Sequence, residues 1–131
     1  MRNIYLYLMT VPVFFAVDML WITVVAKDLY SKSIPGIRPM PNWYAAMAFY
    51  LLYIAGILFF AVLPNVGVSW QKALLYGALF GFFCYATYDL TNYSTLKDWP
   101  LTITLIDLAW GTVLTGTVAT VSYFIANKWI F

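Results

Sequence analysis

The sequence predicts an all-α integral membrane protein, a single bundle of four transmembrane helices. Of the 131 residues, 64% are hydrophobic and 9% are charged, whereas a soluble domain carries about 25% charged residues. Four apolar stretches each reach the roughly 20 residues that a helix needs to cross the hydrocarbon core of a bilayer. We therefore expect one domain over residues 1–131, with spans at about 4–26, 43–63, 71–91 and 101–127.

The first span could be mistaken for a signal peptide. It is too long, it carries Asp18, and it lacks a convincing small-residue cleavage site, so we interpret it as a helix. A polar loop is expected from Lys27 to Asn42, because three prolines and a glycine within 35–41 prevent a continuous helix there.

The remaining spans are bounded by prolines and polar residues. The second span begins at Trp43 and is expected to end at Pro64. The third is expected to end near Leu90, followed by a loop over 92–99. Pro100 suits the first turn of the fourth helix, where its missing N–H is not needed.

Three of the acidic residues lie inside these apolar spans, namely Asp18, Asp89 and Asp107, and the chain has no Glu and no His. A carboxylate within the bilayer costs at least a few kcal/mol, so such residues are usually paired and often functional. Asp18 and Asp107 are expected roughly 10–12 Å from their helix ends at the helical rise. Since helices one and three end at the face where helix four begins, all three acids belong to one half of the bilayer.

Aromatic and amide side chains are expected at similar depths, and they predict a pocket mouth beside the acids. Arg38 and Lys97 lie in the adjacent loops. The candidate ligand-binding residues are Asp18, Trp21, Tyr50, Tyr53, Tyr85, Tyr88, Asp89, Asn92, Asp107 and Trp110.

The same residues also allow a purely structural interpretation. Asp18 and Asp107 could accept hydrogen bonds from Tyr or Trp on adjacent helices and fix the register of the bundle. Asp89 could be an interfacial residue at a helix end, paired with Lys97. A tyrosine-rich stripe is also a common packing feature.

A short repeat links the first and fourth spans. Residues 18–24 and 107–113 both read Asp-x-x-Trp-x-Thr-Val. Residues three apart are neighbours on a helix surface, and the two helices run in opposite directions. One interpretation is a symmetric acid–aromatic clamp, and the other is coincidence.

The fourth span also carries small residues at helical spacing: Ala109, Thr112, Gly116 and Ala119. Small residues allow close helix packing in lipid. The stripe would face either another subunit, giving a homodimer, or helix one or three of the same chain.

The composition argues against several classes of site. With no His and a single cysteine, Cys84, a zinc or haem site is not expected, and no cofactor motif is present. We interpret Cys84 as a small core residue. The basic residues are scattered, so nucleic acid is not an expected partner. The expected partners are membrane lipids and a small cationic or lipid-like ligand.

Several runs of this sequence resemble a known family. They are YATYDLTN at 85–92, LKDWPL at 96–101, IDLAWGT at 106–112, DMLW at 18–21 and FYLLY at 49–53. Together they resemble the bacterial membrane proteins of domain-of-unknown-function family 2177, over nearly the whole chain. The resemblance implies a four-helix, multi-pass protein of the bacterial inner (cytoplasmic) membrane and supplies no activity.

Three functions remain open from the sequence. The first is binding or transport of protons or of a small cationic or amphipathic ligand, because intramembrane acids ringed by Trp and Tyr suit cations. The second is a small membrane-embedded enzyme acting on a lipid or isoprenoid by carboxylate acid–base chemistry; a metal-dependent version would use the acids and Asn92 to bind Mg²⁺. The third is a structural or partner-binding membrane subunit.

Overall fold

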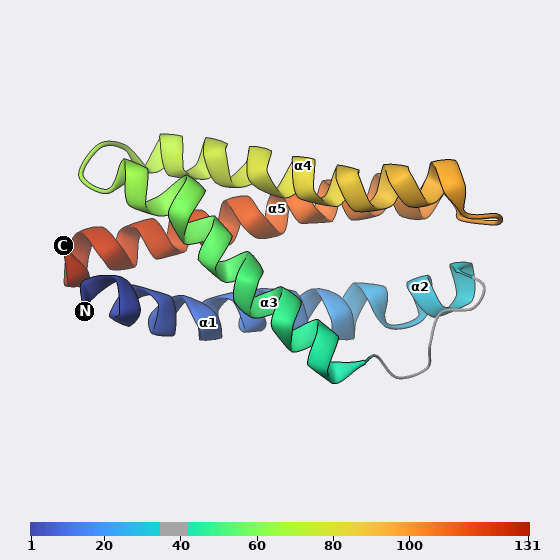
Figure 1. Cartoon of the computed structure of the whole chain (residues 1–131), viewed down its shortest axis with the longest axis horizontal. Coiled ribbons are helices and arrows are strands. Elements are labelled where there is room, and N and C mark those ends of the chain that lie inside the picture. The colour runs from blue at the N-terminus through green and yellow to red at the C-terminus, as the bar shows by residue number, and fades with distance from the viewer. Residues whose placement is uncertain (35–41) are drawn as a thin grey trace.

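The computed structural model describes residues 1–34 and 42–131, without the side chains of Lys27 and Ser31, and every regular element in these ranges is a helix (Figure 1). The predicted four-helix architecture is confirmed. The helices that are long and apolar enough to cross a membrane are Arg2–Ala26, Trp43–Asn65, Trp70–Thr95 and Leu101–Ile130.

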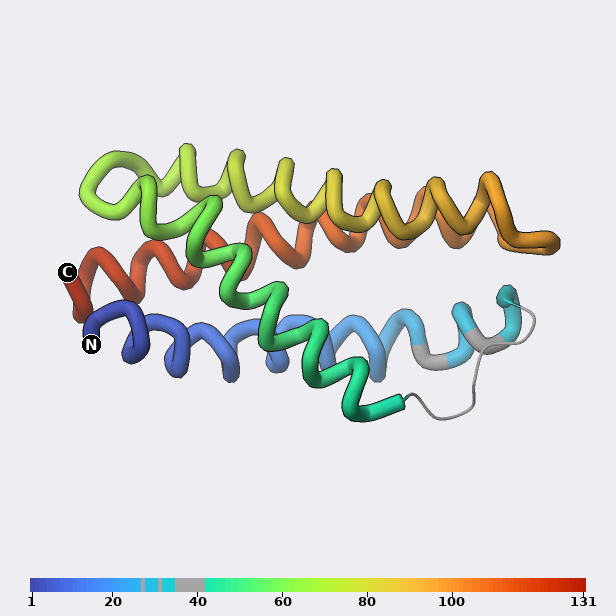
Figure 2. Tube along the Cα trace, viewed as in Figure 1, coloured from blue at the N-terminus to red at the C-terminus, as the bar shows by residue number. Residues whose placement is uncertain are grey.

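The first helical segment continues beyond its membrane span. Helix α1 (Arg2–Trp21) continues through a π-helical turn, η1 (Ile22–Ala26), into α2 (Lys27–Ser33). The prediction of a loop from residue 27 onward is therefore wrong for Lys27–Ser33. This segment contains no proline or glycine, so nothing in it interrupts the helical hydrogen bonds before Pro35. Figure 2 shows α2 prolonging the path of α1.

Helix α3 (Trp43–Ile57) crosses the other spans obliquely, so that its end lies near α4 and its start lies beyond α1 (Figure 1). The Asn42 side chain caps its start by accepting the backbone N–H of Ala45 at 3.2 Å. The span continues through π-helical η2 (Leu58–Val62) and 3-10 helical η3 (Leu63–Asn65).

Helices α4 (Trp70–Thr95) and α5 (Leu101–Ile125) form a long antiparallel hairpin, and α5 continues into π-helical η4 (Ala126–Ile130) (Figure 1). Helix α4 runs beyond the predicted end because 91–95 contains no helix breaker. Pro100 occupies the N-cap of α5, one residue before the expected first turn.

Glycines bring α4 and α5 into close contact. A Cβ on Gly77 would lie 2.5 Å from the Cβ of Ala119, and a Cβ on Gly81 would collide with the Gly111 carbonyl and the Thr115 side chain. No larger residue fits at these positions without moving the helices apart. The hairpin is therefore held at a separation that only small residues permit.

The small-residue stripe of α5 packs partly within the chain. Gly116 faces Leu74 and Ala78 of α4, and Ala119 is fully buried against the same helix. Ala109, at the other end of the stripe, is exposed. Contact with the third span was one of the two expected alternatives, and it accounts for Gly116 and Ala119.

The bundle has two halves. The terminal half contains both chain ends and the buried hydroxyls of Thr10 and Ser122; the acidic half contains Asp18, Asp89 and Asp107, and lies toward α2 and the α4–α5 turn (Figure 1). Most of the fully buried apolar core lies in or near the terminal half: Leu6, Phe14, Ile57, Ala61, Val62, Ala73, Leu114, Val118, Ala119 and Ala126.

Candidate functional site

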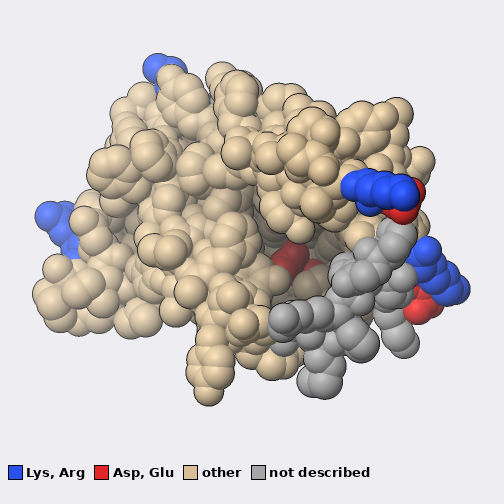
Figure 3. All heavy atoms as spheres, turned by 45° about the vertical axis from the view of Figure 1, so that its right-hand side comes forward, with Lys and Arg blue, Asp and Glu red and all other residues tan. Residues whose placement is uncertain are grey.

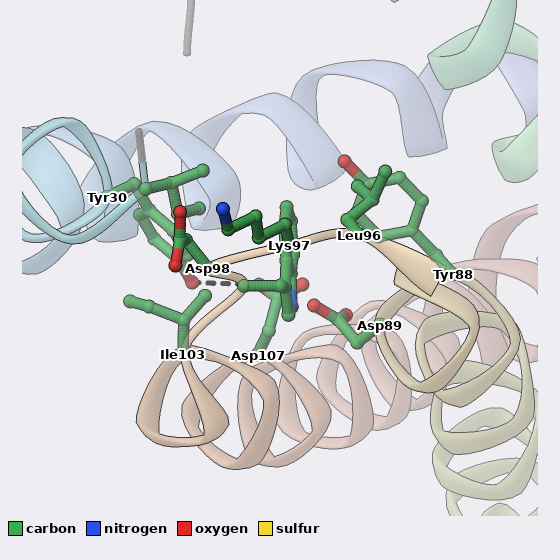
Figure 4. A pocket seen from close by; sticks show the side chains of 10 residues that line it. Tyr30, Tyr88, Asp89, Leu96, Lys97, Asp98, Ile103 and Asp107 are labelled. Carbon is green, nitrogen blue, oxygen red and sulfur yellow. Dashed lines mark hydrogen bonds between the residues drawn. The ribbon is translucent and has the colours of Figure 1, made fainter. Parts of the chain in front are cut away.

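A cavity of about 420 Å³ opens at the loop end of the acidic half, and it contains two of the three acidic residues of the apolar spans. Asp89 enters it from α4 and Asp107 from α5 (Figure 4). The residues lining this polar cavity are Tyr30, Ile34, Tyr88, Asp89, Leu96, Lys97, Asp98, Trp99, Ile103 and Asp107. In a space-filling view, an acidic side chain is visible at the base of a hollow, and other charged side chains lie at the end of the molecule beside it (Figure 3).

Asp89 is the least exposed of the acids, with 0% of its surface accessible to solvent. Neither of its carboxyl oxygens has a hydrogen-bond partner among the described residues. Its carboxyl group points toward that of Asp107, close enough for mutual repulsion when both are charged (Figure 4). A buried, unpaired polar group is costly, and a buried charge is far more so.

This position differs from the interpretation of Asp89 as a helix-end residue. Because α4 continues to Thr95, Asp89 lies more than a turn inside the helix rather than at its end. Lys97 lines the same cavity but is exposed, and it makes no hydrogen bond to Asp89. The expected pairing of these two residues is absent from the described part of the chain.

Asp107 has a donor on α2. The Tyr30 hydroxyl donates a hydrogen bond of 2.7 Å to its carboxylate oxygen Oδ1, shown as a dashed line in Figure 4. Burial, and then the negative charge of Asp107, raise the pKa of the Tyr30 hydroxyl well above its usual range. Tyr30 therefore remains a hydrogen-bond donor at physiological pH.

Tyr30 was missed from the sequence because it falls in the expected loop. The available signal was the absence of proline and glycine from 27–33, which allows the first helix to continue and carry Tyr30 toward the fourth. Arg38, also expected near the acids, lies outside the described residues.

Asp18 lies deeper and in a different environment. It is 7% exposed, and the Trp110 indole and the Tyr50 hydroxyl donate toward its carboxylate. Asp107 is near enough to repel it. The three acids therefore converge, but Asp18 is provided with donors from α5 and α3, an arrangement that suits holding helices in register.

The two copies of the Asp-x-x-Trp motif meet in space. Trp21 and Trp110 stack face to face, with ring centroids 4.4 Å apart and an interplanar angle of 7°. Asp18 from the first copy interacts with Trp110 from the second. The antiparallel α1 and α5 thus bring the motifs together, but the contacts are not symmetric, because Asp107 of the second copy accepts a hydrogen bond from Tyr30.

The predicted tyrosines separate into two groups. Tyr85 and Tyr88 line cavities, and Tyr88 interacts with Asn92 at the outer end of α4. Tyr53 is instead buried in the core, where its hydroxyl bonds the Thr115 hydroxyl at 2.6 Å. Tyr53 therefore packs in the core of the bundle and does not line either cavity.

The described residues contain no group of three or more His, Cys, Asp or Glu side chains that could hold a metal ion. The polar site consists of two carboxyl groups, the Tyr30 hydroxyl that donates to one of them, and the exposed Lys97. A positive charge between the two carboxyl groups would be stabilised there.

The model of a family described as a predicted membrane protein (DUF2177) matches residues 3–124 of the chain. No curated protein and no solved structure matches it. The match covers all four spans up to the last residues of α5.

Proposed function

The chain belongs to the DUF2177 family of predicted membrane proteins, and we propose that it binds a small cationic or amphipathic ligand between Asp89 and Asp107, within the bacterial inner membrane. The observation that carries the proposal is the Asp89 carboxyl group, which is fully buried at the base of a cavity without any hydrogen-bond partner among the described residues. The group within reach of Asp89 is the carboxyl group of Asp107, whereas Asp18 faces the neutral donors Trp110 and Tyr50, as a structural carboxylate would be expected to.

Two adjacent carboxyl groups in a site of low dielectric constant cannot both remain charged without a positive partner. A proton on one of them, or a cation between them, removes the repulsion. The cavity of about 420 Å³ leaves room for a cation larger than a proton.

The walls of the cavity suit an organic cation. Tyr88 and Trp99 lie edge to face, with ring centroids 5.9 Å apart, and both border the cavity. Aromatic faces attract ammonium groups, most strongly where water is excluded. Tyr30, by donating to Asp107, holds that carboxylate in a fixed orientation.

Thermal stabilisation of the purified protein by tetramethylammonium tests the proposal. A ligand at a hundred times its dissociation constant stabilises the folded state by about 2.7 kcal/mol. We expect a rise in the melting temperature of the wild type, beyond that given by sodium chloride at equal ionic strength. The rise should be lost in Asp107→Asn.

Asp28→Asn is the matched control, because it removes one carboxylate outside the cavities. Equal stabilisation of Asp107→Asn and the wild type would contradict the proposal. Acid–base chemistry on a lipid is the competing function of the same carboxyl pair, and turnover of a lipid extract, measured by mass spectrometry, would favour it.

A further inference from the structure

Helix α3 separates from α4 within the acidic half. Tyr53 near its end and Phe60 of the following η2 each stack on Phe80 of α4, with ring centroids 5.4 Å apart. Toward its start, α3 diverges from α4 and passes beyond α1 (Figure 1). The two helices therefore form a wedge that is closed at the terminal half and open at the acidic half.

A second cavity, of about 320 Å³, lies in this wedge. It is lined by Phe49 of α3, by Cys84, Tyr85 and Tyr88 of α4, and by Asp107 of α5. Apart from Asp107 and the tyrosine hydroxyls, its walls are aromatic rings and a thiol. We call it the apolar cavity.

Asp107 and Tyr88 line both cavities, so the apolar cavity adjoins the polar one at the carboxyl pair. At the rim, Phe49 is 46% exposed and Tyr88 is 60% exposed. Both residues belong to membrane-spanning helices. With these helices in a bilayer, the exposed face of Phe49 would border the lipid, and the apolar cavity would form a lateral route from the bilayer to the acids.

Resting on the cation binding proposed above, we propose that the ligand is an amphiphile with one ammonium group on a hydrocarbon chain. The ammonium group lies between Asp89 and Asp107, and the chain lies in the apolar cavity beside Phe49 and Cys84. The ammonium group is placed by charge complementarity with Asp107, which lines both cavities. The hydrocarbon chain then extends through the apolar cavity toward the lipid.

A series of ligands tests this division. Tetramethylammonium, hexyltrimethylammonium and decyltrimethylammonium share one head and differ in chain length. We expect the wild-type affinity to rise roughly two- to four-fold for each added methylene until the apolar cavity is filled, from the free energy of burying a CH₂ group. Affinity is measured by titration at a fixed detergent concentration.

Cys84→Trp narrows the apolar cavity from its α4 wall, beside Phe49 and away from Asp89, which does not line this cavity. This variant should keep the wild-type affinity for tetramethylammonium and lose most of the dependence on chain length. Partitioning of long chains into detergent is the same for both proteins, so the difference between them isolates the cavity. An unchanged dependence in Cys84→Trp would overturn the inference.

Alkylation of Cys84, the single cysteine of the chain, gives a second readout that needs no variant. Decyltrimethylammonium should slow the reaction of Cys84 with N-ethylmaleimide in the wild type, whereas tetramethylammonium should leave it unchanged. Equal rates with both compounds would contradict the chain placement. Failure of tetramethylammonium to bind at all would instead contradict the proposed function.

The ammonium head could belong to a free amphiphile or to a membrane aminolipid. Reconstitution in phosphatidylglycerol vesicles, with or without phosphatidylethanolamine, distinguishes these sources. If phosphatidylethanolamine suppresses binding of decyltrimethylammonium, the aminolipid headgroup occupies the site between Asp89 and Asp107. If binding is unchanged, the ligand of this site is a free amphiphile.

Discussion

In the terminal half of the bundle a buried hydroxyl pair is satisfied across helices, whereas in the acidic half a buried carboxyl group has no donor among the described residues. Thr10 donates to the Leu6 carbonyl at 2.8 Å, which leaves the Ser122 hydroxyl, 3.0 Å away, as donor to Thr10. Asp89 is equally buried but unpaired. A paired polar group stabilises a bundle, whereas the unpaired carboxyl group of Asp89 is the basis of the proposed ligand site.

The packing of the helices follows the same division. Toward the terminal half, α4 and α5 approach through glycine and alanine, and α3 closes against Phe80. In the acidic half α3 diverges, and cavities take the place of side chains. The tight contacts hold the scaffold, and the open wedge is where a ligand can be accommodated.

The largest effect is expected from breaking the tight α4–α5 contact. Gly81→Val places side-chain atoms where the Gly111 carbonyl and Thr115 already lie. We expect a loss of about 3 kcal/mol or more in the free energy of unfolding, at the upper end for overpacked sites. Thermal unfolding in detergent measures it. Ala55→Val, on an exposed position of α3, is the control and should be nearly neutral; equal losses in both would refute the role of the contact.

Asp89→Asn should raise the free energy of unfolding of the ligand-free protein, whereas Gly81→Val lowers it. The variant replaces a carboxyl group that repels Asp107 when both are charged, and its amide can donate to Asp107. We expect stabilisation of about 2 kcal/mol, the typical cost of an unsatisfied buried group, together with loss of tetramethylammonium binding. The melting temperature without ligand measures the first effect. A lower melting temperature would show that Asp89 contributes to packing, as the hydroxyls of the terminal half do.

The terminal half should respond to Thr10→Val by losing stability. The substitution leaves the buried Ser122 hydroxyl without its acceptor. We expect a loss of about 1 kcal/mol, in the range measured for hydrogen bonds between membrane helices. Thr10→Val/Ser122→Ala should lose less than the sum of the two single variants. Strict additivity in this double-mutant cycle would mean that the two hydroxyls are not coupled.

The smallest effect concerns Tyr30 at alkaline pH. Its pKa is raised in the folded protein by burial and by Asp107, so the unfolded chain loses this proton first, as the pH rises through about 10. The stability linked to Tyr30 is therefore present below that pH and is lost above it. Wild type should lose melting temperature more steeply than Tyr30→Phe between about pH 8 and about pH 11.

Tyr44→Phe, which removes an exposed tyrosine, controls for the general effect of alkaline pH. It should follow the wild type across the same range. A Tyr30→Phe curve that also parallels the wild type would show that the bond to Asp107 does not perturb Tyr30.

Apolar composition and the positions of proline and glycine were sufficient to predict the four spans, because length and apolar composition determine which segments can cross a bilayer. The ends were less accurate. The polar composition of Lys27–Ser33 and 92–95 predicts loops, but without proline or glycine these segments continue the helices. Polarity marks where a chain leaves the lipid, not where its helix stops.

The depth of the acids predicted which residues would share one half of the bundle, and Asp18, Asp89 and Asp107 do converge. Depth could not tell which acid would be paired. That depends on the rotation of each helix and on the oblique path of α3, which the pattern of apolar residues leaves undetermined because nearly every face is apolar. The rotation of the helices also explains why Tyr88 is exposed while Tyr53 is buried.

The central claim is that the unpaired Asp89 carboxyl group forms part of a cation-binding site. Isothermal titration of purified wild type and Asp89→Asn with tetramethylammonium, side by side, tests it most directly. We predict saturable binding at one site in the wild type and none in the variant. Equal binding in both proteins, or no saturable binding in the wild type, would contradict the claim.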